Sequence, residues 1–105
     1  MFAVIGTDTY LDELQKWPRD DQEAAAKIPL HLKENPHIGK PLGYPYLREK
    51  RIGGHRVYYL IYDDLKLVLL VATSDKKDQQ VTIDHIKGNL DEFRKVAEKN
   101  FKQVS

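Results

Sequence analysis

The chain has 105 residues and a formal net charge of +1, and hydrophobic residues make up 41% of it. This length fits one domain with a single core, and no apolar run approaches the roughly 20 residues of a membrane span, which argues against an integral membrane protein. The sequence contains no cysteine, which excludes disulfides and thiolate metal sites and is common in a reducing cytosol. We therefore expect one cytoplasmic domain over residues 1–105, with no secretory signal, because the apolar start FAVIG is too short for one.

The first third of the chain predicts a strand followed by two helices. The β-prone residues of FAVIG indicate a short strand. Thr7 is a candidate N-cap for a helix that ends before Pro18. A second helix is predicted over residues 19–34, kinked at Pro29, and the two helices should form an antiparallel hairpin.

The middle of the chain predicts a loop followed by three antiparallel strands. Residues 35–45 have the composition of a loop. Strands at residues 46–52 and 55–62 flank the tight turn Gly53-Gly54, which favours a two-residue hairpin. The third strand, at residues 66–73, is apolar on both faces and should be central in the sheet.

The remainder predicts helix, with residues 87–105 as an amphipathic C-terminal tail that a break at Gly88 separates from the preceding helix. The tail either packs on the sheet or covers a groove and pairs with a partner helix. The order of elements predicts an α+β fold: an N-terminal strand and helical hairpin packed on a mainly antiparallel four-stranded sheet, with a C-terminal helix. We expect the first strand to join the central part of that sheet.

Charge is unevenly distributed along the chain. Residues 1–39 carry four basic and seven acidic side chains, whereas residues 40–60 carry five basic and one acidic. Positive charge gathered on one hairpin suggests a local anion site. The alternative is a solvated hairpin whose charges only maintain solubility.

The hairpin geometry places two arginines face to face. In a two-residue hairpin Ile52 pairs with His55 and Arg51 with Arg56, and Glu49 lies next along the same face as the arginines. Like charges directly opposite each other are destabilising, so the pair invites an anion. A phosphate suits two guanidinium groups, and a bridge from Glu49 to both arginines is the alternative.

Histidines and strand tyrosines are further candidates for a site. His31, His37, His55 and His85 show no metal-ligand spacing, so we expect neither a metal nor another cofactor. Tyr58, Tyr59 and Tyr62 could stack on bases, although tyrosines on strands more often fill a sheet face.

The segment KPLGYPYLREKRIGGHRVYYLIYDDLKLVLLVATSDKKDQ resembles the core of the RelE/ParE toxin superfamily of prokaryotic toxin–antitoxin modules, and LREKRIGGHRVYY is its most specific part. The resemblance covers about residues 2–86. It implies a compact toxin held inactive by a cognate antitoxin. In RelE-type members it also implies metal-independent cleavage of messenger RNA on the ribosome. There a base activates the ribose 2′-hydroxyl, basic groups stabilise the phosphate, and an acid protonates the leaving oxygen.

The resemblance also assigns roles to individual residues. Arg51 and Arg56 match two basic strand positions, and Lys76 falls where RelE-type toxins carry an arginine after the last strand. The strand lysines that serve RelE as acid and base align with Leu47 and Glu49, and its late tyrosine aligns with Thr82.

The expected catalytic and RNA-binding residues combine these matches with the chemistry of histidine and the positive charges nearby. The catalytic set is Arg51, Arg56, Lys76, Glu49 and His85, with Glu49 as a base and His55 or His85 as a residue that moves a proton. The RNA-binding set is Arg48, Lys50, His55 and Lys77. As alternatives, Lys76-Lys77 is a solvated turn and His85 a plain surface residue.

The sequence therefore predicts a ribosome-dependent mRNA endoribonuclease whose partners are an antitoxin, the ribosome and mRNA, with no membrane association. Two alternatives stay open because of the departures at Leu47, Glu49 and Thr82. One is a ParE-like, non-nucleolytic inhibitor of DNA gyrase. The other is a degraded member that only binds its antitoxin.

Overall fold

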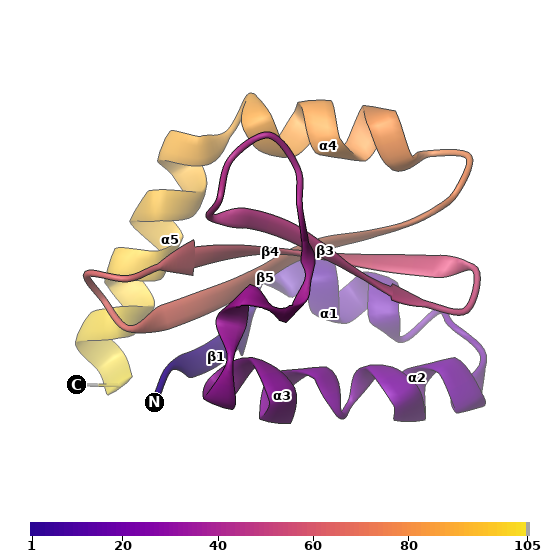
Figure 1. Cartoon of the computed structure of the whole chain (residues 1–105), viewed down its shortest axis with the longest axis horizontal. Coiled ribbons are helices and arrows are strands. Elements are labelled where there is room, and N and C mark those ends of the chain that lie inside the picture. The colour runs from indigo at the N-terminus through magenta and orange to yellow at the C-terminus, as the bar shows by residue number, and fades with distance from the viewer. Residues whose placement is uncertain (105) are drawn as a thin grey trace.

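The protein is a three-layer α/β/α sandwich around one sheet (Figure 1). The computed structural model describes the backbone of residues 1–104 and the side chains of residues 1–101. Helices α1 (Asp8–Leu14), α2 (Arg19–Ala25) and α3 (Ile28–Glu34) lie on one face of the sheet. Helices α4 (Gln79–Lys87) and α5 (Leu90–Val104) lie on the other. Ser105, the last residue of the predicted tail, is outside the described residues.

The sheet has five strands in the order β1-β5-β4-β3-β2. Their bounds are β1 Ala3–Gly6, β2 Lys40–Pro41, β3 Leu47–Ile52, β4 His55–Tyr62 and β5 Leu67–Asp75. The pairs β2–β3, β3–β4 and β4–β5 are antiparallel, and β1 pairs with β5 in parallel. The α+β class and the mainly antiparallel sheet are thus confirmed.

Two details of the predicted sheet are wrong. The sheet has a fifth strand, because Lys40 and Pro41 in the predicted loop pair with Glu49 and Arg48. A pairing of two residues is too short to leave a periodic pattern in the sequence. The second error is the centre of the sheet: β4 lies there and not β5 as expected, and β1 lies at an edge.

The helical hairpin begins as predicted, with the Thr7 hydroxyl oxygen accepting a hydrogen bond from the Tyr10 N–H at 3.1 Å. The predicted second helix is two helices, α2 and α3, separated at Ala26 and Lys27. Pro29 lies in the first turn of α3, where a missing N–H costs nothing because it would have no intrahelical partner. The Pro29 ring thus starts a helix where a kink was expected.

The core is divided by the sheet into two clusters. Below the sheet, α1–α3 bury Tyr10, Trp17 and Leu32 against strand residues such as Tyr59. On the other face, a second cluster of buried residues lies beneath α4 and α5: Leu47, Tyr58, Leu60, Leu69, Ile83, Ile86 and Ala97. Both faces of the central strands are therefore dry, which explains the unbroken apolar run of β5.

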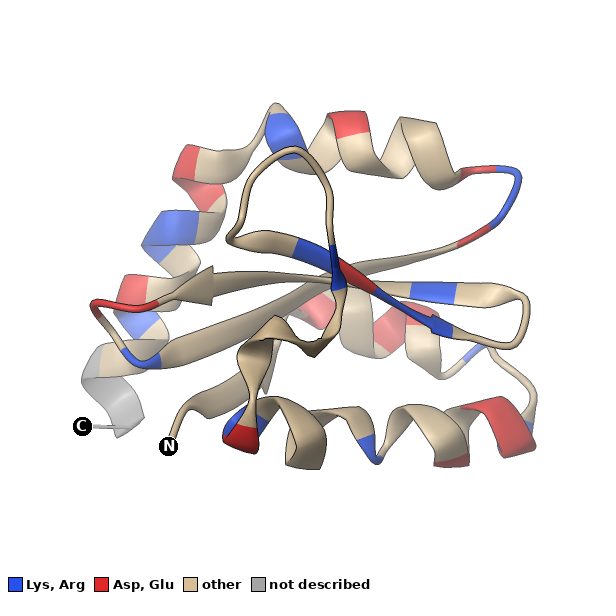
Figure 2. Ribbon diagram, viewed as in Figure 1, with Lys and Arg blue, Asp and Glu red and all other residues tan. Residues whose placement is uncertain are grey.

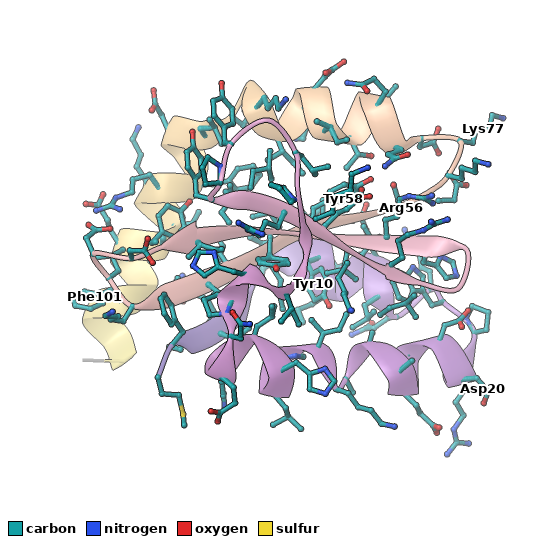
Figure 3. The ribbon with its side chains drawn as sticks, in the orientation of Figure 1. Tyr10, Asp20, Arg56, Tyr58, Lys77 and Phe101 are labelled. Carbon is teal, nitrogen blue, oxygen red and sulfur yellow. The ribbon has the colours of Figure 1, made fainter. Side chains whose placement is uncertain are left out.

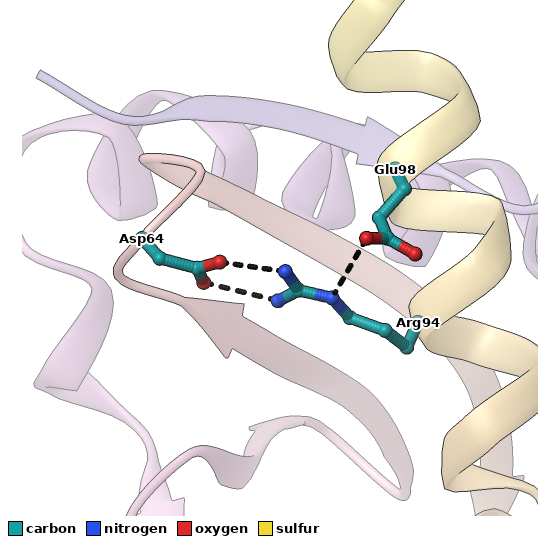
Figure 4. A network of polar contacts seen from close by, with 3 residues as sticks. All are labelled: Asp64, Arg94 and Glu98. Carbon is teal, nitrogen blue, oxygen red and sulfur yellow. Dashed lines mark hydrogen bonds and ion pairs between the residues drawn. The ribbon is translucent and has the colours of Figure 1, made fainter.

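The helix α5 is fastened to the β4–β5 turn by an ion-pair network (Figure 4). The Arg94 guanidinium donates to both oxygens of Asp64, at 3.0 and 2.6 Å, and its Nε lies 3.6 Å from Glu98. These hydrogen bonds are the largest cause that lowers the pKa of the Asp64 carboxyl from its usual value. The described part of the tail thus packs on the sheet, and Gly88 ends α4 as predicted.

In the described part of the chain, the helices are all too short or too polar to cross a membrane.

Candidate functional site

The predicted arginine pair lies on the sheet face beneath the start of α4. Arg51 on β3 pairs with Arg56 on β4, and Ile52 pairs with His55, so the predicted register is confirmed. Gly53 has a φ of +57°, a left-handed conformation that glycine adopts without strain, and it makes the tight turn possible. Figure 2 shows the basic segments of the two strands and a further basic segment in the connection from β5 to α4.

Arg56 is a buried cation, with only 4% of its surface exposed. Within the part of the chain that the structure describes, its Nε has no hydrogen-bond partner. Figure 3 shows Arg56 next to Tyr58, between the sheet and the β5–α4 connection. A buried guanidinium without a partner is costly, and an anion that enters beside it removes that cost.

Glu49 is also buried, at 5% exposure, but it is held by an amide and not by the arginines. The Gln79 Nε2 group, in the first turn of α4, donates to both carboxylate oxygens of Glu49 at 3.2 and 2.9 Å. Among the described residues, Glu49 makes no ion pair within 4.0 Å. The alternative in which Glu49 bridges both arginines is thus wrong, and the arginines remain open to an external anion.

Two hydroxyl groups lie close to Arg56 and Glu49. The Tyr58 hydroxyl and the Ser74 Oγ are 2.8 Å apart, and Ser74 on β5 pairs with Arg56 on β4. Burial raises the pKa of Tyr58, and the neighbouring Glu49 raises it further against the opposing effects of Ser74 and Arg56. The phenol therefore keeps its proton at neutral pH and can donate it in a hydrogen bond.

Lys76 and Lys77 lie in the connection between β5 and α4, and both are exposed. The Lys77 side chain points outward beyond the hairpin end of the sheet (Figure 3). The connection starts from β5 one residue after the pair Arg56–Ser74, so its lysines border the same end of the sheet.

Arg48 is positioned away from this cluster, with its guanidinium turned to the loop before β3. Its Nε donates to the Pro45 carbonyl at 2.8 Å, and its Nη1 donates to the carbonyls of His37 and Gly39 at 3.1 and 2.9 Å. Strand alternation puts Arg48 and Lys50 on the face opposite to Arg51.

His55 also lies on that opposite face. Its ring stacks on Trp17 with centroids 4.2 Å apart, and its Nε2 is 3.3 Å from the Asp21 carboxylate. These contacts join the tip of the strand hairpin to the turn between α1 and α2.

His85 lies on the exposed side of α4, at a third place. It lines a hollow of about 540 Å³ together with Glu13, Thr73, Thr82 and Phe93, beside the edge of β5 that β1 leaves free. The structure thus brings together Glu49, Arg51 and Arg56, which we call the arginine cluster, with Lys76 and Lys77 at its border. The other predicted site residues lie apart from this cluster: Arg48, Lys50, His55 and His85.

Gln79 and Ser74 belong to the cluster but were not predicted as site residues, and Tyr58 was a candidate only for stacking on bases. Tyr58 and Tyr59 are fully buried, so the packing role predicted for strand tyrosines holds for both. Alternation in the sequence places Tyr58 on the Arg56 face, but only the tertiary structure shows that Ser74 and Gln79 reach it. Among the described residues, no three His, Asp or Glu side chains form a group that could hold a metal ion.

Comparison with solved structures gives the fold. The isolated RelE toxin of E. coli superposes with a TM-score of 0.65 at 20% identity, over 83% of this chain and 97% of that one. A chain of the RelBE2 toxin–antitoxin complex of Mycobacterium tuberculosis gives 0.62 at 25% identity, over 71% and 98%. The archaeal RelE–RelB complex of Pyrococcus horikoshii gives 0.63 at 18% identity, over 71% and 94%.

Sequence comparison gives the family. A search of curated protein sequences returns no significant match. The family model described as the ParE toxin of type II toxin–antitoxin systems, parDE, matches residues 7–80. These residues include the helical hairpin, the strands β2 to β5 and the arginine cluster. The chain therefore belongs to the RelE/ParE superfamily and is a toxin of a type II toxin–antitoxin module.

Proposed function

We propose that this toxin cleaves messenger RNA on the ribosome and is neutralised by a cognate antitoxin. The observation that carries the proposal is the buried Arg56 guanidinium, which has an unpartnered Nε and faces Arg51 on the same side of the sheet. Two adjacent guanidinium groups suit the charge and geometry of a phosphodiester, and they bind it more strongly as negative charge grows in the transition state.

The cluster supplies chemistry for cleavage by the ribose 2′-hydroxyl. Glu49 is the candidate base, since Gln79 holds its carboxylate on the arginine face. Arg51 and Arg56 bind the scissile phosphate, and Lys76 stabilises the charge that develops on it. The half-buried Ser74 hydroxyl, which accepts from the buried Tyr58 and donates to the Asp75 carbonyl, is the candidate donor to a leaving 5′-oxygen once it turns away from that carbonyl. His85, which lies elsewhere, has no part in this scheme.

An antitoxin partner is supported by the solved structures that share the fold, because several of them are complexes of RelE with its antitoxin. An antitoxin that covers the arginine cluster with a carboxylate would also supply the anion that Arg56 lacks. The toxin would act in the cytoplasm, where messages are translated.

A second candidate function is inhibition of DNA gyrase without RNA cleavage. One observation favours it: Leu47 and Glu49, which align with the lysines of RelE-type toxins, are both buried, at 0% and 5% exposure. Two mobile lysines on this face are thereby replaced by a core residue and a fixed carboxylate.

A two-arm inhibition assay tests the proposal against this alternative. The purified toxin is added to a cell-free translation reaction and, separately, to a supercoiling reaction with purified gyrase. We expect translation to stop while supercoiling continues, and addition of the cognate antitoxin to restore translation. Arrest of supercoiling with normal translation would reject the nuclease in favour of the gyrase inhibitor.

A further inference from the structure

Tyr44 and Tyr46 form an exposed aromatic pair at the loop between β2 and β3. Their rings stack with centroids 5.0 Å apart and an interplanar angle of 13°, and 39% and 38% of their surfaces are exposed. Tyr58 and Tyr59, for which base stacking was the alternative to packing, are buried and cannot offer a ring face to RNA. This loop pair is where the fold exposes aromatic rings.

The aromatic pair is surrounded by cations. The Lys87 Nζ lies 5.5 Å from the centroid of the Tyr44 ring, and Arg48 borders the same loop. A hollow of about 390 Å³ beside Tyr44 is walled by Pro41, Gly43, Pro45 and Arg48. Aromatic and proline faces with basic groups at the rim are what an unpaired nucleobase and its phosphates require.

The loop is held in place on the same side of the sheet as the arginine cluster. It rises from the sheet toward the end of α4 (Figure 1), where Lys87 approaches it. Gly43 has a φ of +93°, a backbone conformation that would strain any residue with a Cβ. A hydrogen bond from the Arg48 Nε to the Pro45 carbonyl also holds the loop, and the same guanidinium donates to the carbonyls of His37 and Gly39 just before β2.

The aromatic pair and the arginine cluster mark the two ends of α4. Gln79, which holds Glu49, is in its first turn, and Lys87 is its last residue. Eight residues of helix span about 12 Å, a separation that a few nucleotides of extended single strand can cross. One RNA strand can therefore contact both places.

We propose that Tyr44 and Tyr46 form a base-stacking subsite for single-stranded RNA, a few nucleotides from the phosphate held by Arg51 and Arg56. The inference rests on the proposed function, because it gives that RNA a second point of contact. The subsite takes an unpaired base on the aromatic pair, with Lys87 near a flanking phosphate. Stacking needs a ring face and not the tyrosine hydroxyl.

The experiment measures binding of fluorescein-labelled RNA octamers by anisotropy, with an abasic site moved through the octamer one position at a time. We expect the Tyr44→Leu/Tyr46→Leu variant to bind the intact octamer roughly 10- to 100-fold more weakly, the effect of one lost base stack. The Tyr44→Phe/Tyr46→Phe control should bind as the wild type does. One abasic position should weaken wild-type binding by a similar factor and leave the leucine variant unaffected.

Two results would overturn the subsite. One is equal binding of all octamers by the wild type and the leucine variant, and the other is loss of antitoxin binding alone in that variant, which would make the loop a protein-docking surface. Both are distinguishable from failure of the proposed function, which is read separately as translation arrest. Thermal unfolding of each variant shows that the fold is intact.

Discussion

At the level of single residues, burial of the Arg56 guanidinium is the feature of this sheet face that costs the most free energy. Removing a charge from water costs several kcal/mol unless a partner replaces the lost hydration. Glu49 is the acidic group nearest to Arg56 in strand register, but its carboxylate accepts hydrogen bonds from Gln79. It therefore does not serve as the internal anion that would offset the burial of Arg56. We interpret Arg56 as a residue kept for a ligand and not for stability.

Substitution of Arg56 by methionine tests this interpretation. We expect the free energy of unfolding of Arg56→Met, from urea denaturation, to be unchanged or raised by about 1 kcal/mol or more, because a packed apolar chain replaces a buried charge. Cleavage should fall by roughly 100-fold or more, the usual effect of losing one transition-state donor. The exposed Arg51→Met is the matched control and should lose activity without any change in stability.

The opposite stability result would contradict it. If Arg56→Met lowered the free energy of unfolding by about 2 kcal/mol or more, Arg56 would be satisfied within the folded protein as a structural residue.

Strand register explains which site residues could be predicted. The pairs Arg51–Arg56 and Ile52–His55 followed from Gly53-Gly54 alone, because a two-residue turn fixes every partner. The same alternation shows that Arg48 and Lys50 lie on the opposite face from Arg51. The prediction placed Arg48 and Lys50 at the site because of their charge and the resemblance, although alternation alone puts them on the other face.

Contacts between distant residues could not be predicted in this way. The stacking of His55 on Trp17 joins segments far apart in the chain. Gln79 contacts Glu49 across 30 residues, and no local pattern encodes that contact.

At the level of elements, short pieces of structure caused the main errors. The two-residue strand β2 and the break between α2 and α3 are too brief to produce a periodic signal. The long elements were predicted well: β4 begins at His55 and ends at Tyr62, as expected. Two features of the tail were also foreseen, namely its amphipathic face and its break at Gly88.

The tether between α5 and the β4–β5 turn gives a prediction at this scale. The substitution Asp64→Asn removes the charge that Arg94 contacts, so we expect faster hydrogen exchange in the amides of residues 93–101 and unchanged exchange in α4. Asp63→Asn, in the same turn, is the control. Equal exchange in both variants would show that the ion pair does not hold α5.

The tether should also weaken in acid. The pKa of Asp64 lies below its ordinary value, chiefly because of the hydrogen bonds from Arg94. Its contribution to stability is therefore complete above the ordinary carboxyl pKa and is lost as pH falls through the lowered value.

For the molecule as a whole, charge is sorted by location. Acidic residues dominate the first 39 positions, which form β1 and the helices below the sheet, whereas basic residues gather on the strands and the β5–α4 connection (Figure 2). If the proposed function holds, such a field would draw RNA to one end of the protein and make the association depend on salt.

Salt dependence of binding tests this distribution. For ribosomes that carry a message, the slope of log K against log salt should become shallower by about 1.4 in Lys76→Ala/Lys77→Ala, since each lost contact with a single strand contributes about 0.7. Lys16→Ala/Lys27→Ala removes the same charge from the helical side and should leave the slope as in the wild type. Equal slopes in the two double variants would exclude specific phosphate contacts by the lysines.

The central claim is that Arg51 and Arg56 act on the scissile phosphate of a translated message. Primer extension on the message recovered from cell-free translation tests it most directly, with the wild type, Arg51→Ala, Arg56→Lys and the exposed Arg19→Ala as a control. We predict discrete, ribosome-dependent cuts with the wild type and Arg19→Ala, and none with the two site variants. Cuts that persist at the same positions in Arg51→Ala and Arg56→Lys would contradict the claim.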